Sequence, residues 1–135
     1  MKQIWVVSIL VCSQIIGCTL SGTVVDCGNF ETTLSHVELK KYPALHVYYS
    51  GGKRMIKLNM INTVIIDPSF TMTVDNELYF SADITLRNGV RLRSLDKDET
   101  KLTKAYISVQ DVLTGKNEND QFAIGLENVL RITIK

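Results

Sequence analysis

The clearest pattern in the chain is a strict alternation of apolar and polar positions over residues 78–86. The apolar positions are Leu78, Phe80, Ala82, Ile84 and Leu86, and the polar positions are Tyr79, Ser81, Asp83 and Thr85. Successive side chains of a strand point to opposite faces, so this period of two predicts a strand with one buried and one solvated face. Strands of this kind are typical of antiparallel sheets.

A hairpin is predicted after this strand, where Asn88-Gly89 precedes a second alternating segment. Directly opposed residues share a face, so the register must place apolar residues opposite one another. A two-residue loop would place arginines on the apolar face, whereas a three-residue loop over 87–89 would not. We therefore expect the longer loop, with Gly89 at positive φ. The expected pairs are Leu86 with Val90, Ile84 with Leu92 and Asp83 with Arg93.

The same reasoning predicts a tighter hairpin around Gly51-Gly52. Here a two-residue loop of these glycines keeps the apolar residues on one face. The expected apolar pairs are Val47 with Ile56 and Leu45 with Leu58, and the expected polar pairs are Tyr48 with Met55 and His46 with Lys57.

An internal repeat relates two distant segments. Apolar residues at positions 56, 58, 61, 64 and 66 recur at 124, 126, 129, 132 and 134, always with an offset of 68. Spacings of two indicate strand, and the two spacings of three indicate a turn between strands. Each copy therefore predicts a strand, a corner and a second strand. The alternative explanation is that apolar β sequences resemble one another.

The fold class follows from these strands. The segment 31–42 is left open between a short helix and a strand, because Thr32, Thr33 and Val37 are mediocre helix formers. We expect an all-β fold, a small antiparallel β-sandwich or barrel, in which two similar β units would pack face to face.

The first residues follow a different pattern, that of a signal peptide. Lys2 precedes an apolar run from Ile4 to Gly17, which is shorter than the roughly 20 residues of a spanning helix. We expect residues 1–17 to be removed on export. An uncleaved anchor is the alternative, because no charge follows Lys2 before Asp26.

The end of this run, Ile15-Ile16-Gly17-Cys18, resembles the lipobox of bacterial lipoproteins. The resemblance covers four residues, and Ile16 is bulkier than the residue usual at its position. It implies that Cys18 receives a diacylglycerol through a thioether and becomes the acylated first residue. Several acyl chains on one residue anchor a protein firmly. Thr19, in place of Asp, implies the outer membrane if the source is Gram-negative.

Cys18 also has a second interpretation. Ordinary cleavage would leave it able to form a disulfide with Cys27 in an oxidising compartment, and the protein would then be secreted. In both cases we expect residues 18–28 to form a tether and residues 29–135 to form a single β domain. A chain of this length buries enough surface for one core.

Charge and motifs restrict the chemistry. The chain carries 15 Lys and Arg against 14 Asp and Glu, without a basic stripe, which argues against a nucleic-acid partner. Neither a phosphate-binding loop nor a calcium loop occurs, and no orienting motif accompanies a nucleophile. We therefore expect no catalytic residue, no metal and no cofactor.

Three residues are candidates for binding. Tyr48 and Tyr79 are predicted on the polar faces of their strands, and His46 lies beside Tyr48. Exposed aromatic residues supply much of the energy of binding surfaces, although shielding of the sheet is a sufficient alternative. We expect a non-catalytic envelope lipoprotein, a binding or structural module with a lipid-anchored membrane contact and a protein or glycan partner. A small secreted or periplasmic enzyme is the alternative.

Overall fold

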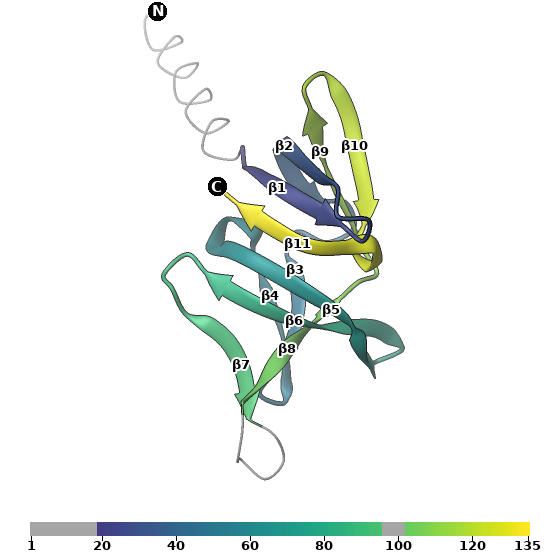
Figure 1. Ribbon diagram of the computed structural model, residues 1–135. Coiled ribbons are helices and arrows are strands. Elements are labelled where there is room, and N and C mark those ends of the chain that lie inside the picture. The colour runs from purple at the N-terminus through teal and green to yellow at the C-terminus, as the bar shows by residue number, and fades with distance from the viewer. Residues whose placement is uncertain (1–18, 96–101) are drawn as a thin grey trace, which may run out of the picture.

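Strands make up most of the described chain, which comprises residues 19–95 and 102–135 of this computed structural model (Figure 1). The strands are β1 (Ser21–Asp26), β2 (Glu31–Leu39), β3 (Leu45–Tyr49), β4 (Gly52–Ile56), β5 (Ile61–Val74), β6 (Glu77–Leu86), β7 (Arg91–Leu95), β8 (Leu102–Ser108), β9 (Val112–Asn117), β10 (Asp120–Gly125) and β11 (Val129–Ile134). Two short 3-10 turns, η1 (Leu58–Met60) and η2 (Leu126–Asn128), interrupt them.

The strands form one antiparallel sheet. Their order is β10-β9-β2-β1-β11-β5-β6-β7-β8-β3-β4, and β6 also pairs directly with β8. The sheet is bent, so the strands from β10 to β11 lie over those from β5 to β4 (Figure 1). One core cluster draws residues from both halves, including Leu34 and Ile132 from one and Val47 and Ile84 from the other. The predicted all-β antiparallel class is confirmed, and its form is a continuous half-barrel.

The internal repeat corresponds to real structural equivalence. In each copy a strand ends, a 3-10 turn follows and a second strand begins, and the buried leucine of each turn is Leu58 or Leu126. The backbone matches as well, since Lys57 has φ −68° and ψ 144° and Gly125 has φ −66° and ψ 140°. The hairpins before the turns share one register at the same offset, because Leu45 pairs with Ile56 and Leu113 with Ile124.

The two copies are related by an approximate two-fold axis. β5 and β11 pair antiparallel with Val64 opposite Ile132, which are equivalent residues of the repeat. Outward from this pair, β6, β8, β3 and β4 on one side correspond to β1, β2, β9 and β10 on the other. The predicted pair of similar β units is therefore present, joined edge to edge in one sheet.

The hairpin after β6 has the predicted three-residue loop. Gly89 has φ 89°, the Leu86 N–H donates to the Val90 carbonyl at 2.8 Å, and Ile84 pairs with Leu92. Asp83 forms an ion pair with Arg91, and the backbone of Arg93 pairs with Lys104 of β8. The side chain of Arg93 lies outside the described part of the structure, so the expected Asp83–Arg93 pair stays a prediction.

The hairpin between β3 and β4 differs from its prediction by one residue. Ser50 and Gly51 form the two-residue loop, with φ 53° and 75°, and Gly52 begins β4. Both positions of such a turn need positive φ, and Ser50 adopts it in place of Gly52. The faces are as predicted, but the predicted pairs are wrong: the pairs are Leu45 with Ile56, His46 with Met55, Val47 with Arg54 and Tyr48 with Lys53.

The N-terminal part of the described chain also differs from expectation. Residues 21–26, expected within a tether, form β1 between β2 and β11 because Val24 and Val25 are buried. The open segment 31–42 is resolved as strand over Glu31–Leu39. Within residues 19–95 and 102–135, no helix has the length and apolar character needed to cross a membrane.

Candidate functional site

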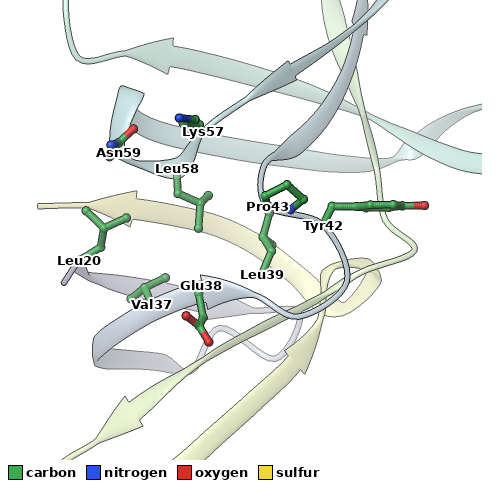
Figure 2. Close-up of a pocket in the computed structure, with 9 residues that line it drawn as sticks. All are labelled: Leu20, Val37, Glu38, Leu39, Tyr42, Pro43, Lys57, Leu58 and Asn59. Atoms are coloured by element: carbon green, nitrogen blue, oxygen red, sulfur yellow. The ribbon is translucent and has the colours of Figure 1, made fainter. Parts of the chain in front are cut away.

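A groove opens beside the first described residues of the chain (Figure 2). We call it the Leu20 groove; its volume is about 330 Å³, and its lining consists of Leu20, Val37, Glu38, Leu39, Tyr42, Pro43, Lys57, Leu58 and Asn59. The apolar side chains come from the residue before β1, from β2 and from η1. Pockets for small molecules are concave and mostly apolar, with a few polar groups, and this groove has that composition.

Local backbone features direct the apolar residues into the groove. His36 has φ 53° within an irregularity of the β2–β9 ladder, and the bulge turns the buried Val37 toward the core. The Val37 N–H donates to the Leu20 carbonyl at 3.0 Å and so fixes the chain at the groove wall. The η1 turn buries Leu58 against the same wall. The sequence therefore shapes the groove through one bulge and one corner.

Polar groups surround the mouth of the groove. Glu38, Lys57 and Asn59 are exposed. Tyr42 is half-buried, and its Oη donates to Glu77 Oε2 at 3.1 Å. The Tyr42 ring stacks on His46 with 3.9 Å between ring centroids, so this end of the groove is held by an aromatic pair.

The two-fold axis places a second hollow beside the other 3-10 turn. We call it the Asp111 hollow; its volume is about 430 Å³, and its lining is Lys40, Lys41, Val109, Gln110, Asp111, Val112, Gly125 and Glu127. The buried Asp111 carboxylate accepts from the backbone N–H groups of Lys41 at 2.7 Å, Tyr42 at 3.1 Å and Val112 at 2.7 Å. The two hollows lie at equivalent corners and differ in charge: four of the eight residues that line the Asp111 hollow are charged, against two of the nine that line the Leu20 groove.

A third hollow lies on the β3–β4 hairpin. We call it the His46 hollow; its volume is about 450 Å³, and its lining is His46, Lys53, Arg54 and Met55. Met55 is 65% exposed. Lys53 forms an ion pair with Asp75, and Arg54 lies over the Tyr49 ring with 4.5 Å from its guanidinium carbon to the ring centroid. The hollow combines two cations with an exposed apolar side chain.

The predicted binding residues lie in different environments. His46 and Tyr48 are half-buried on β3, and His46 lines the hollow named after it. Tyr79, in contrast, is 0% exposed, so its predicted exposure is wrong. Cys18 lies outside the described residues, and Cys27 is exposed. The structure brings together two of the three candidates, His46 and Tyr48.

Tyr79 is buried next to segments distant in the sequence: it pairs with Ser108 of β8, and Lys53 lies near enough to act on its pKa. Burial raises the pKa of Tyr79, as does Glu77, while Lys53 lowers it. Tyr79 Oη and His46 Nε2 are buried without a hydrogen-bond partner in the described part of the chain. Alternation within β6 could not reveal this burial, which involves segments distant in the sequence.

Sequence reasoning missed the residues of the Leu20 groove. The sequence predicts Leu20 in a tether and Leu58 in a strand opposite Leu45. The three-residue step from Leu58 to Ile61 in the repeat was the signal for the corner. No comparable signal marked Leu20, because its contacts with β2 are long-range.

Known chemistry and known relatives add little to this geometry. Within the described ranges, no three His, Cys, Asp or Glu side chains come together as a metal site. Comparison with protein-family models, with curated proteins and with solved structures finds no match to this chain.

Proposed function

We propose that this chain is a non-catalytic lipoprotein of the bacterial envelope, anchored through Cys18, whose β domain binds a protein or glycan partner. The observation that carries the proposal is the short distance in sequence between anchor and domain. The lipobox-like segment ends at Cys18, and β1 begins at Ser21. A domain joined so closely to acyl chains works at a membrane surface.

The His46 hollow is the surface that we propose for the partner. Exposed Met55, the His46 ring and the cations Lys53 and Arg54 line the hollow, and Tyr48 pairs with Lys53 across the hairpin. Aromatic residues, Met and Arg are enriched at protein interfaces. The equivalent positions of the other β unit carry Gln121, Phe122 and Ala123, without either cation. The hollow is thus specific to one half of the molecule.

Fatty-acid labelling tests the anchor. Cells that express the full chain should incorporate labelled palmitate into it, and the protein should partition into detergent. Cys18→Ser should abolish both, because the thiol is the acceptor. Equal labelling of the two forms, or a Cys18–Cys27 disulfide found by mass spectrometry, would contradict the proposal.

Partner capture tests the surface. The double variant Arg54→Ser and Met55→Ser should weaken binding of a co-purified protein or envelope glycan about tenfold or more, since interface anchors commonly contribute more than 1 kcal/mol each. The control is Gln121→Ser on β10, at the position equivalent to Lys53, and it should bind as the wild type does. Equal weakening by both changes would exclude the His46 hollow as the binding surface.

A further inference from the structure

We infer that one acyl chain of the lipid on Cys18 lies in the Leu20 groove of the same molecule. The inference rests on the proposed lipid anchor and adds an occupant for the groove. The β domain then binds part of the lipid that anchors it.

The covalent path favours this occupant. Leu20 lines the groove and follows Cys18 by two residues, so their Cα atoms lie within about 7 Å along a fully extended chain. The hydrogen bond from Val37 N–H to the Leu20 carbonyl holds this part of the chain against the groove wall. An acyl chain on Cys18 therefore starts at the groove, and tethering gives it a high effective concentration there.

The groove lining suits a hydrocarbon. Figure 2 shows Leu20, Val37 and Leu58 converging on one space from the residue before β1, from β2 and from η1. Val37 and Leu58 are part of the core cluster, and Leu20 and Leu39 pack against it. A chain of methylenes that enters this space leaves water, which is favourable by about 0.8 kcal/mol for each buried CH₂.

The two-fold axis supplies an internal comparison. The Asp111 hollow at the equivalent corner includes four charged residues, where the Leu20 groove includes two. The Leu20 groove is also the hollow nearer Cys18 in the sequence, so it is the one within reach of an acyl chain on that residue.

The balanced charge at the groove mouth favours the protein's own acyl chain over a separate phospholipid. One exposed acid, Glu38, and one exposed base, Lys57, lie among the lining residues, so their charges balance. An anionic headgroup would be drawn to a surplus of positive charge. The diacylglycerol of a lipoprotein carries no phosphate and needs none. The remaining acyl chains would hold the membrane, since two chains suffice for stable anchoring.

Photo-crosslinking of the lipidated full chain tests the inference. Cells would be supplied with a diazirine fatty acid, and the protein would be purified in detergent, irradiated and mapped by mass spectrometry. We expect crosslinks to groove residues of β2 and η1. Leu39→Glu should reduce them at least tenfold, and Val112→Glu, in the Asp111 hollow, should leave them unchanged.

A second variant guards against misfolding. Pro43 is exposed and lines the groove, so Pro43→Trp should fill the space, keep the circular dichroism of the wild type and also lower the crosslinks at least tenfold. Label on Cys18 without crosslinks to the groove, or crosslinks unchanged in folded Pro43→Trp, would overturn the inference and leave the anchor intact. Absence of label on Cys18 would overturn the proposed function itself.

Discussion

At the residue scale, Tyr79 combines complete burial with a polar group. Its ring is fully buried, and its hydroxyl has no hydrogen-bond partner among the described residues. An unsatisfied buried polar group costs about 1–3 kcal/mol. The cost arises because folding removes the Tyr79 hydroxyl from water and the described residues offer it no other partner.

Tyr79→Phe should therefore stabilise the domain by about 1 kcal/mol, since it removes the unpaired hydroxyl and keeps the ring. Urea unfolding followed by fluorescence would measure the change. Tyr48→Phe, at a half-buried tyrosine of β3, is the control and should change the free energy of unfolding by less than about 0.5 kcal/mol. A loss of stability in Tyr79→Phe would show that the hydroxyl is satisfied in solution.

The same substitution should change the response to high pH. The pKa of Tyr79 is raised in the folded protein, so the folded state holds this proton more tightly than the unfolded state does. The resulting stability is present below about pH 10, the unfolded value, and is lost as pH rises through the folded pKa. The wild type should lose stability above pH 10 more steeply than Tyr79→Phe. Parallel pH curves would contradict this assignment.

At the scale of elements, each of the two 3-10 turns places a leucine in the core. Leu58 and Leu126 are buried in equivalent turns, and Leu58 also faces the Leu20 groove. Each corner turns the chain from a strand at or near the sheet edge into a central strand. The corners thus determine which strands meet at the two-fold axis.

Leu58→Ala and Leu126→Ala should each lower the free energy of unfolding by about 2–5 kcal/mol, as expected for buried leucines. Leu126→Ala should lose more, because Leu126 is 0% exposed and Leu58 is 6% exposed. Chemical denaturation would measure both. Glu127→Ala, at an exposed position of η2, is the control and should change stability by less than about 0.5 kcal/mol. A negligible effect at either leucine would remove that corner from the core.

The elements also show how far the sequence could be interpreted. Period-two patterns and the offset of 68 predicted β3, β6, β7, the Gly89 loop and the two corners, because those signals are local, whereas β1 and β2 were not predicted as strands. The β3–β4 loop consists of Ser50 and Gly51, one residue before the predicted Gly51-Gly52. Glycine favours positive φ, so the sequence alone does not indicate that Ser50 adopts it and that Gly52 does not. The groove and the burial of Tyr79 depend on contacts between distant segments, and no local pattern encodes them.

At the scale of the whole molecule, the ends of the described domain are neighbours. The Lys135 N–H donates to the Ser21 carbonyl at 2.8 Å, and β1 pairs with β11. The β5–β6 turn at Asp75 and Asn76 is the two-fold equivalent of this junction. A chain with its termini at either of these two places should therefore form the same sheet.

A circular permutant tests this equivalence. A short Gly/Ser linker from Lys135 to Ser21, with new ends between Asp75 and Asn76, should give a cooperatively unfolding protein with the far-ultraviolet circular dichroism of the parent domain. A permutant opened between Ile65 and Ile66, inside central strand β5, should fail to fold. Failure of the first permutant would show that the β5–β6 turn is required for folding.

The axis through Val64 and Ile132 has a consequence for how the two units can differ. Closed two-fold pairing, in which the same surface meets itself, is the commonest arrangement of identical protein subunits. Here two five-stranded units, with β7 as an addition to one, meet in that way within one chain. The fold thus has within one chain the arrangement of a two-fold homodimer, with a continuous sheet across the axis. Because one polypeptide carries both units, equivalent positions can hold different residues, as Lys57 and Gly125 do, which identical subunits could not.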